Sequence, residues 1–529
     1  MEDFIPLPKR IVLTGFMGTG KSCVGKLLAD KLGYTFIDTD QIICEKSGLR
    51  VADYFAQHGE ATFRALESQV LQEALAQEGV VVAVGGGAIL SAHNRRLIQK
   101  LSQPILLTAS VASILQRLAH DTGRPLLKGD DKEGQIQALL QKRAPLYFKI
   151  EAQIHTDDLS ISEVVEKILK ILSQNPHCHY VELGTRRYPI YFEHDALPNL
   201  SRKLRQHFSG KKIIILTNST VGKIYLKTIA TALTKHFEVA VIKIPDGERY
   251  KNLNTVSKIY AQLVKLKADR QSLLLALGGG VVGDIAGFVA GTYLRGIPFV
   301  QVPTTLLAQV DSSVGGKTGV DLASGKNLVG VFHQPKLVFI DTLFLKTLPK
   351  RELLAGMAEV IKYGAIRDEG LFARVEALAE SILQGEYELL KTIVRRSCEI
   401  KADIVEQDEF ETTGLRSLLN FGHTVGHAVE TVTGYRRYLH GEAIAMGMVF
   451  AAKKSLRLGF CHAQEIERLE RLLKIFNLPT ELPKLPLPKL KRTLLADKKR
   501  VSSFINFVYL RKVGEAFVQK TKVESIFGN

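Results

Sequence analysis

The most specific chemical signature in the chain lies near its N-terminus, at residues 15–22. These residues read Gly-Phe-Met-Gly-Thr-Gly-Lys-Ser and match the phosphate-loop pattern G-x-x-x-x-G-K-[ST] in full. In such a loop, successive backbone N–H groups surround a phosphate, and the N-terminus of the following helix adds partial positive charge. Lys21 would reach the β- and γ-phosphates of ATP, and Ser22 would ligate Mg²⁺. The residues expected to bind the nucleotide are Gly15, Gly18, Thr19, Gly20, Lys21 and Ser22.

Further polar residues in the first third of the chain could bind the molecule that accepts a phosphoryl group. They include two carboxylates after a short strand, a run of three glycines, and an arginine in a Gly-Arg-Pro-Leu-Leu stretch that looks like a mobile lid. Each such charge alone is more often a surface charge or an ion-pair partner, so the prediction depends on the set. The candidates are Asp38, Asp40, Arg64, Gly86, Gly87, Arg124 and Arg143.

A second glycine cluster, at residues 278–284, reads Gly-Gly-Gly-Val-Val-Gly-Asp. It differs from the Rossmann pattern G-x-G-x-x-G because its glycines are contiguous and an aspartate closes it. A compact polar turn at residues 246–251 precedes it, and glycines and hydroxyls beside Lys317 and Lys326 follow it. Glycines and hydroxyls beside lysines suit a ligand that carries phosphate. The second half therefore contains a different kind of anion site.

Imidazole and carboxylate groups further along could form a metal site. Glu359 falls in a helical pattern, His423 and His427 are one helical turn apart on the same face, and His440 precedes Gly-Glu. Imidazole and carboxylate ligands without cysteine suit a catalytic zinc ion that keeps an open position. Spacing alone favours His423 and His427 as the ligand pair. One histidine by itself is more often structural or solvated, so the metal prediction depends on the cluster.

In their order and spacing, the motifs up to residue 172 resemble those of the shikimate kinases. The resemblance implies that Asp40 binds hydroxyls of shikimate and orients or deprotonates the attacking one, and that Arg64 and Arg143 bind its carboxylate. Bidentate pairing with carboxylate is the physical reason for guanidinium there. Gly86 and Gly87 would donate backbone hydrogen bonds to the acceptor, Asp38 would help hold Mg²⁺, and Arg124 would close over ATP and stabilise the transferring phosphoryl group.

From about residue 179 to the end, the motifs closely resemble those of the 3-dehydroquinate synthases. The resemblance implies that zinc (or cobalt) is held by Glu359, His423 and His440, in place of the pair that spacing favours. His427 would contact the substrate and assist proton transfer. The implied NAD-binding positions are Asp246, Glu248, Lys251, Gly279, Gly280, Asp284, Thr304 and Thr305, with Lys317 and Lys326 beside them. The implied substrate positions are Asp311, Lys317, Asn327, Lys362, Lys401, Arg416, Asn420 and Lys498, with Arg295 a further candidate near the phosphate.

The chemistry of that family accounts for these residue types. NAD⁺ oxidises a secondary hydroxyl of 3-deoxy-D-arabino-heptulosonate 7-phosphate, zinc polarises that oxygen, phosphate leaves, and the hydride returns before ring opening and an aldol closure give 3-dehydroquinate. Lys317, Lys362, Arg416 and His427 are expected to take part in the reaction. The sequence departs from the family pattern by one extra residue within 409–414, and the choice between Lys498 and Lys499 stays open.

Hydrophobic periodicity predicts the elements that position these residues. Strands are expected at residues 10–14, 80–84 and 105–108 in the first half, and at 212–217, 239–244, 273–277 and 299–302 in the second. Helical patterns lie between them, as in parallel α/β sheets. From about residue 345 helical patterns dominate, with one small strand near 504–510. The fold class is an α/β phosphate-loop kinase domain fused to an α/β NAD-binding domain and a mainly helical metal-binding domain.

Domain boundaries follow from changes in these patterns. We expect a kinase-like domain at residues 1–172, a polar linker at 173–180, an NAD-binding domain at 181–344 and a helical domain at 345–529. Dimerisation through the second half is a further expectation from the resemblance. The two implied reactions are not consecutive in aromatic precursor synthesis, so direct transfer of product between the sites is not expected.

Composition limits the classes of partner. Net charge is +17, but the longest basic cluster, residues 498–500, is short and tryptophan is absent, so anionic metabolites are favoured over nucleic acid. No apolar run reaches the length of a membrane span, and the N-terminus lacks the pattern of a signal peptide. The five cysteines are scattered singly, which favours a reducing compartment, so we expect a cytoplasmic enzyme.

Two other functions compete with this bifunctional interpretation. The second half could be an oxidoreductase related to glycerol dehydrogenase, which also uses NAD and metal, but the many lysines among the candidate substrate residues argue against it. The whole chain could instead be a nucleotide sensor or scaffold with inactive sites. The motif residues are intact, which places this alternative last.

Overall fold

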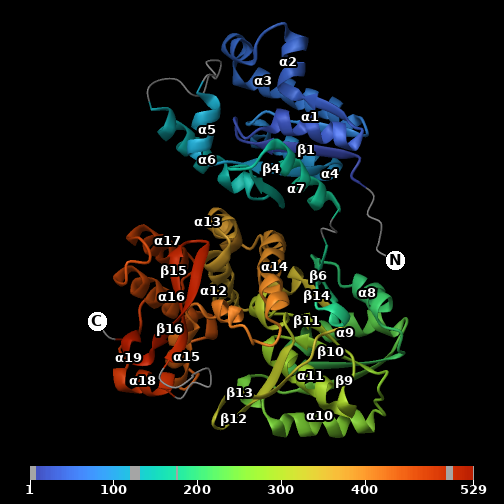
Figure 1. Cartoon of the computed structure of the whole chain (residues 1–529). Helices are drawn as coiled ribbons and strands as arrows, with labels where there is room; N and C mark the ends of the chain where they lie inside the picture. Colours follow the sequence, from blue (N-terminus) through green and yellow to red (C-terminus); the bar gives the residue numbers. More distant parts are fainter. Residues whose placement is uncertain (1–6, 120–130, 174–176, 496–503, 528–529) are drawn as a thin grey trace. The chain divides into compact units, whose positions relative to one another are not determined.

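A computed structural model describes residues 7–119, 131–173, 177–495 and 504–527 of the chain. Contacts between residues divide it into two compact units, Met1–Asn175 and Pro176–Asn529. Figure 1 labels the helices and strands of both. In the described residues, no helix is both long and apolar enough to cross a membrane.

The first unit is built on a five-stranded parallel sheet with the strand order β2-β3-β1-β4-β5. Its strands are β1 (Arg10–Gly15), β2 (Thr35–Asp38), β3 (Val80–Ala83), β4 (Gln103–Thr108) and β5 (Ala152–His155). The three strands expected here from the sequence are confirmed, with ends that differ by one or two residues. Parallel pairing requires a crossover between neighbouring strands, and helices supply it.

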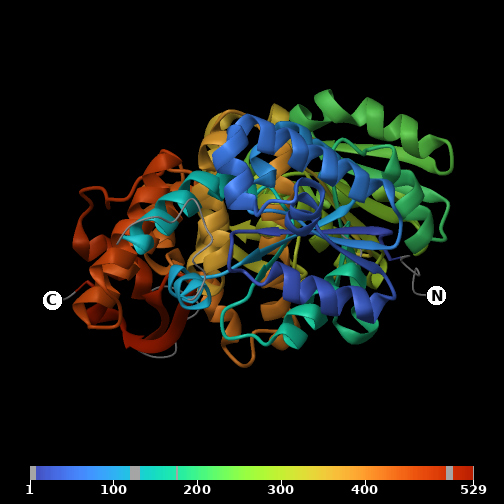
Figure 2. The same ribbon diagram turned by 90° about the horizontal axis from the view of Figure 1, so that it is seen from above.

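Helices cover both faces of this sheet, as Figure 2 shows for its central strands. One face packs against α1 (Lys21–Leu32) and α7 (Ile161–Ser173), and the other against α3 (Val51–Ala76) and α4 (Ala92–Leu101). The remaining helices of the unit are α2 (Thr39–Ser47), α5 (Val111–Leu118) and α6 (Lys132–Tyr147). The phosphate loop begins where β1 ends, Asp38 is the last residue of β2, and the glycine run comes after β3. All three therefore lie at the carboxyl edge of the sheet, where ligands of such sheets bind.

The second unit contains a seven-stranded sheet with the order β6-β7-β14-β11-β10-β8-β9. Its strands are β6 (Cys178–Val181), β7 (Tyr188–Glu193), β8 (Lys212–Asn218), β9 (Glu238–Ile244), β10 (Leu273–Gly278), β11 (Phe299–Pro303) and β14 (Val338–Asp341). All neighbours are parallel except β6, which runs antiparallel to β7. Residues 178–180, expected in the linker, therefore belong to a strand, because Cys178 and Val181 are buried against the sheet.

Helices α8 (Asn199–His207) and α9 (Ser219–Thr234) cover one face of the sheet, and α10 (Leu253–Lys265) and α11 (Gly280–Thr292) cover the other. A hairpin of β12 (Lys317–Leu322) and β13 (Gly325–Phe332) packs against α11. The sequence did not predict this hairpin, because its glycines and lysines are typical of a ligand-binding loop.

The rest of the second unit is mainly helical, as expected. Its helices are α12 (Lys350–Arg367), α13 (Glu369–Leu383), α14 (Leu390–Gln407), α15 (His423–Val432), α16 (His440–Arg457), α17 (Ala463–Ile475), α18 (Leu487–Leu495) and α19 (Val523–Ile526). The single strand expected near residues 504–510 is one arm of a hairpin formed by β15 (Phe504–Lys512) and β16 (Glu515–Lys522). Gly514 allows the tight turn, since its φ of 92° is a conformation that favours glycine.

Candidate active sites

The phosphate loop adopts the strand–loop–helix arrangement that its pattern requires. It joins β1 to α1, and glycine is required at its first position because a Cβ on Gly15 would lie 2.2 Å from the carbonyl oxygen of Leu107. Lys21 Nζ donates hydrogen bonds to the carbonyl oxygens of Gly15 at 3.0 Å and Phe16 at 2.9 Å. These bonds fold the lysine over the loop, where its ammonium would meet a bound phosphate.

Ser22 and Asp38 form the candidate magnesium site. Ser22 Oγ donates a hydrogen bond to Asp38 Oδ2 at 2.7 Å, although the two residues come from different elements. Asp38 is held in turn because it caps the next helix, where its Oδ1 accepts from the backbone N–H of Asp40 in the first turn. A hydroxyl and a carboxylate are the hard oxygen ligands that Mg²⁺ prefers beside nucleotide phosphates. The two predicted ligands thus lie together at the mouth of the phosphate loop.

Three of the predicted acceptor-binding side chains converge on the glycine run 85–87. A Cβ on Gly85 would lie 2.8 Å from Asp40 Oδ1, and a Cβ on Gly87 would lie 2.5 Å from Arg64 Nη2. Arg143 Nη1 donates to the carbonyl oxygen of Gly86 at 2.9 Å. Glycine is therefore needed here for close approach, and one carboxylate and two guanidinium groups surround the run. This arrangement suits a small hydroxylated carboxylic acid.

Two residues that the sequence analysis did not assign hold this acceptor site in place. Glu67 is buried and accepts from Arg64 Nη1 at 2.8 Å, and burial raises the pKa of its carboxyl despite that neighbour. Tyr147 donates its hydroxyl to the carbonyl oxygen of Gly86 at 2.8 Å. The spacing of Arg64 and Glu67, three residues apart on a helix, was the available signal for that pair. The predicted lid arginine, Arg124, lies outside the described residues.

The predicted NAD-binding residues gather around the start of α11. Gly279 caps this helix and Gly280 begins it, so the helix N-terminus faces the end of β10. Lys251 is buried, and its Nζ donates to Asp284 Oδ2 at 2.5 Å and Asn327 Oδ1 at 2.6 Å. Burial alone would lower the pKa of Lys251, but the nearby carboxylates of Asp284 and Glu248 outweigh it and raise that pKa. A helix N-terminus beside a fixed ammonium suits a pyrophosphate.

The remaining members of this set line the same edge of the sheet. Thr304 and Thr305 directly follow β11, and the buried Thr304 Oγ1 has no hydrogen-bond partner among the described residues. Asp246, after β9, accepts from the backbone N–H of Thr220 at 3.2 Å. Asn327, predicted to bind substrate, lies within the NAD set through its bond to Lys251. Lys326 Nζ lies 3.0 Å from Glu248 Oε1.

The predicted metal ligands come together from three helices. Glu359 lies on α12, His423 begins α15 and His440 begins α16. Glu359 Oε1 lies 3.4 Å from His423 Nε2 and 3.5 Å from His440 Nε2. His427 also belongs to the cluster, since one ligand atom from each of the three histidines falls within 4.8 Å of the others. The histidine pair favoured by spacing and the three ligands implied by the family resemblance therefore lie at one place.

The chemistry of these side chains fits a transition-metal ion. Glu359 is fully buried, and its Oε1 has no hydrogen-bond partner within the described parts of the chain, although it faces two imidazole nitrogens. Burial alone would raise the pKa of Glu359, but the Lys362 ammonium and the imidazole of His423 hold that pKa well below its usual value. An ionised, buried and unpaired carboxylate oxygen between two ring nitrogens is the donor set expected of a zinc or cobalt site.

Groups behind the ligands orient the imidazole rings. His440 Nδ1 lies 3.2 Å from Oε2 of the buried Glu430, and His423 Nδ1 lies 3.2 Å from the carbonyl oxygen of Phe421. Metal-binding histidines typically donate their other ring N–H to such acceptors, which turns Nε2 toward the metal. The sequence analysis did not find Glu430, because nothing in its local pattern separates it from a surface glutamate.

Cationic side chains predicted to bind substrate lie close to the candidate metal ligands, through contacts with Asp311 and Glu359. Lys401 Nζ donates to Asp311 Oδ1 at 2.7 Å, and Lys362 Nζ contacts Glu359 Oε2. Arg416 is buried, and its Nη1 donates to the carbonyl oxygen of Glu409 at 2.7 Å while its Nε has no partner among the described residues. A buried guanidinium with a free donor suits an anionic ligand.

Lys317 forms an ion pair with Glu411. Glu411 lies in the stretch that carries one residue more than the family pattern, and its φ is 59°. Both side chains are partly exposed, with exposed fractions of 44% and 38%. A turn at Glu411 thus places a carboxylate on a predicted substrate-binding ammonium.

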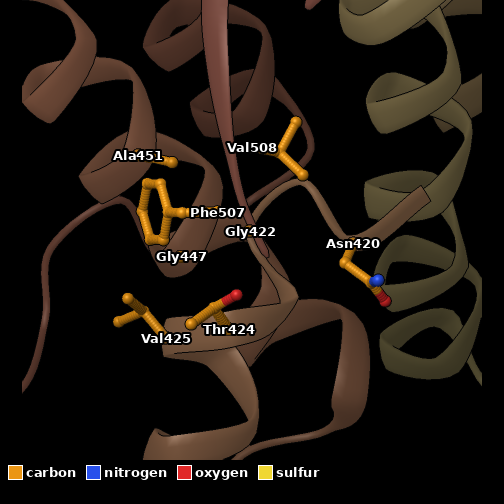
Figure 3. Close-up of a pocket in the computed structure, with 8 residues that line it drawn as sticks. All are labelled: Asn420, Gly422, Thr424, Val425, Gly447, Ala451, Phe507 and Val508. Atoms are coloured by element: carbon orange, nitrogen blue, oxygen red, sulfur yellow. The ribbon is translucent and has the colours of Figure 1, made fainter. Parts of the chain in front are cut away.

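Three predicted substrate residues have other surroundings. Asn420 lines a narrow pocket with Gly422 and Thr424 under β15 (Figure 3). Arg295 is exposed just beyond the far end of α11, and in the described part of the chain no hydrogen bond or ion pair joins it to the other candidates. Lys498 lies outside the described residues.

Comparison with known proteins matches both units. The shikimate kinase family model matches residues 17–173, and the models for the N-terminal and C-terminal parts of 3-dehydroquinate synthase match residues 241–355 and 356–500. A 3-dehydroquinate synthase of Thermoanaerobacter pseudethanolicus is 48% identical over 347 residues, which are 65% of this chain and 97% of that protein.

Solved structures also match the two units. The structure of 2-epi-5-epi-valiolone synthase from Streptomyces hygroscopicus, with NAD⁺ and Zn²⁺ bound, covers 65% of this chain and 95% of its own, at 27% identity and a TM-score of 0.60. Shikimate kinase from Acinetobacter baumannii in complex with shikimate is 37% identical over 32% of this chain and 94% of its own, at a TM-score of 0.31. The chain therefore belongs to the 3-dehydroquinate synthase family, with a shikimate kinase domain ahead of the synthase, and it joins two enzymes of the shikimate pathway.

Proposed function

We propose that the named residues of both units carry out the reactions of these two families. For the first unit the proposal is phosphoryl transfer from ATP with Mg²⁺ to the 3-hydroxyl of shikimate. The main support is the convergence of Asp40, Arg64 and Arg143 on the glycine run, one strand away from the phosphate loop. Lys21 binds the phosphates, and Ser22 with Asp38 holds Mg²⁺.

The acceptor is oriented by its own charged and hydroxyl groups. Arg64 and Arg143 bind the carboxylate of shikimate, and the N–H groups of Gly86 and Gly87 donate to its hydroxyls. Asp40 accepts a hydrogen bond from the attacking hydroxyl and takes its proton as the bond to phosphorus forms. Arg124 stabilises the charge on the transferring group. Positioning and charge stabilisation account for nearly all of the catalysis in such transfers.

For the second unit we propose conversion of 3-deoxy-D-arabino-heptulosonate 7-phosphate into 3-dehydroquinate with release of phosphate. The observation that carries this assignment is the buried Glu359 Oε1, which faces His423 and His440 and finds no hydrogen-bond partner among the residues that the structure describes. When bound, NAD⁺ supplies the hydride acceptor and a zinc or cobalt ion, held by these three residues, supplies Lewis acidity.

The chain's own residues bind and orient the substrate of the synthase. Lys317, Lys362, Lys401 and Arg416 neutralise its phosphate and carboxylate, and Asp311 fixes Lys401. His427 moves a proton at the substrate hydroxyl beside the metal ligands. Lys251, Asp284 and the start of α11 hold the pyrophosphate side of NAD. Lys326 links the polar turn at residues 246–251, in the NAD set, to the metal site. Its Nζ lies 3.0 Å from the carboxylate of Glu248 and 4.0 Å from that of Glu430.

We further propose that the synthase unit works as a homodimer. Arg295 lies at the end of α11 opposite Gly280, about 20 Å away at 1.5 Å per helical residue. Its φ of 65° and that of Leu294, 51°, are strained conformations that occur often at functional sites. Among the described residues, no hydrogen bond or ion pair joins Arg295 to the other substrate candidates of its own chain, and we infer that it acts on the site of a second copy. R295A and H427A chains are each expected to be inactive alone. A mixture regains activity if Arg295 of one copy acts on the site of the other copy. The mixture stays inactive if Arg295 acts on the site of its own chain.

The direct test of the proposed function is a paired assay of the purified chain. With ATP, Mg²⁺ and shikimate it forms 3-phosphoshikimate, and with NAD⁺, Zn²⁺ and the phosphorylated heptulosonate it releases phosphate and forms 3-dehydroquinate. Absence of either product from a folded, metal-loaded preparation overturns that half of the proposal. We place the enzyme in the cytoplasm on the support of five scattered cysteines that form no disulfide in the described residues, and cell fractionation tests this placement.

A further inference from the structure

Tyr363 is fully buried beside the synthase site, in a position that no step of the proposed mechanism uses. It lies on α12 directly after Lys362 and one helical turn after Glu359. The same helix therefore carries a metal ligand, a substrate-binding lysine and this tyrosine. A buried tyrosine hydroxyl needs a hydrogen-bond partner, and the identity of that partner indicates what the residue does.

The Tyr363 hydroxyl donates a hydrogen bond to Asp311 Oδ1 at 2.8 Å. Asp311 lies in a single π-helical turn, Ala308–Ser312, a rare conformation that occurs often at functional sites. The same Oδ1 accepts from Lys401 Nζ at 2.7 Å, and Lys401 also donates to the main-chain oxygen of Asp311 at 2.7 Å. Two donors from two helices, α12 and α14, thus fix one carboxylate oxygen.

The aromatic ring of Tyr363 makes a second contact with the site. Lys362 Nζ lies 4.7 Å from the centre of the ring, within the range of a cation–π interaction. The same ammonium contacts Glu359 Oε2. One side chain therefore contacts both Asp311, which holds Lys401, and the ammonium of Lys362.

The charge state of Tyr363 agrees with a permanent donor. Burial, together with the negative charges of Asp311 and Glu359, raises the pKa of its hydroxyl well above the ordinary value. The phenol is therefore protonated at neutral pH.

We propose that Tyr363 is a positioning residue of the synthase. Its hydroxyl orients Asp311 and, through Asp311, the ammonium of Lys401. Its ring supports the ammonium of Lys362. This inference rests on the substrate-binding roles proposed above for Asp311, Lys362 and Lys401. Without the hydroxyl, Asp311 keeps Lys401 but loses its second donor, so the carboxylate and the ammonium turn together away from the substrate. The ring contact and the metal site stay intact in Y363F.

A double-mutant cycle with Y363F and D311N tests the proposal in the full chain. Y363F is expected to lower the kcat/KM of the synthase for the phosphorylated heptulosonate about tenfold, the effect of losing one hydrogen bond to a charged group. Zinc content, NAD affinity and the shikimate kinase rate of the same preparation stay unchanged. In the D311N background Y363F has no further effect, because the group through which it acts is already altered.

Y225F is the matched control, because Tyr225 is also buried in this unit and shares a hydrogen bond with Thr347 outside the site. The kcat/KM of Y225F is expected to equal that of the wild type. This holds even if Y225F lowers the melting temperature as much as Y363F does. An equal loss of kcat/KM in Y225F identifies general destabilisation and overturns the proposal.

The remaining outcomes separate this inference from the proposed function. If D311N is impaired while Y363F equals the wild type, or if the two losses multiply, Tyr363 does not act through Asp311 and the inference is wrong. If D311N itself equals the wild type, the proposed role of Asp311 fails and the inference fails with it.

Discussion

His440 Nδ1 lies 3.2 Å from Glu430 Oε2, and this contact turns the opposite ring nitrogen of His440 toward Glu359. Glu430 is ten residues before His440 in the chain and nearly fully buried. The proposed metal site thus includes a supporting carboxylate outside its ligand set.

Replacement of Glu430 by glutamine is expected to weaken zinc binding about 10- to 100-fold, because the histidine loses its charged acceptor while all ligands remain. Competition with a chromogenic chelator measures this affinity. E470Q is the control, since Glu470 on α17 pairs with Lys453, which lies more than three helical turns after His440 on α16. Equal zinc affinity in E430Q and the wild type contradicts the orienting role.

Removal of metals is expected to separate the two activities. After exhaustive chelation both reactions stop, because one needs a metal-nucleotide and the other a Lewis acid. Mg²⁺ alone then restores only phosphorylation of shikimate, and Zn²⁺ or Co²⁺ is needed for synthase activity. Coupled assays of both products follow the recovery. Recovery of the synthase with Mg²⁺ alone contradicts the assignment of Glu359, His423 and His440 to a transition-metal site.

Substitution E67Q is expected to raise the KM for shikimate about tenfold, since Arg64 loses its buried charged partner and is no longer held toward Gly87. The KM for ATP stays unchanged. Initial-rate kinetics with each substrate varied in turn measure both constants. Glu60 lies 3.5 Å from the same guanidinium but is exposed, so E60Q serves as the control and should behave as the wild type. A similar effect in both variants argues against a specific role for Glu67.

Substitution K251M is expected to destabilise the synthase unit by about 3 kcal/mol, because the carboxylate of Asp284 is left buried without its partner. NAD affinity falls as well. Because contacts divide the chain into two units, calorimetry should resolve two transitions, of which only one shifts. K258M, on the exposed side of α10, leaves both transitions in place. A shift of both transitions in K251M contradicts independent units.

The features that the sequence predicted best are those formed by residues close together in the chain, within about one or two helical turns. The phosphate loop and the pair His423 and His427 are local patterns, and the strands rich in branched residues, such as β8, stand out for the same reason. Strand β5, with a single isoleucine among four residues, and β7, which contains a proline, carry no such signal.

Contacts between residues far apart in the chain could not be predicted in this way. Tyr363 and Asp311 are separated by 52 residues, and Lys317 and Glu411 by 94. A single sequence records the type of each residue but not which distant residue it meets, because that depends on how the helices pack. The ligand groups were therefore predictable, and the residues that orient them were not.

The most direct test of two independent active sites is a reciprocal assay of K21A and H423A in the full chain. K21A is expected to lose phosphorylation of shikimate and to keep the wild-type rate of phosphate release by the synthase, and H423A is expected to show the opposite pattern. Calorimetry of both variants confirms that each unit is folded. Loss of both activities in either folded variant would contradict the account.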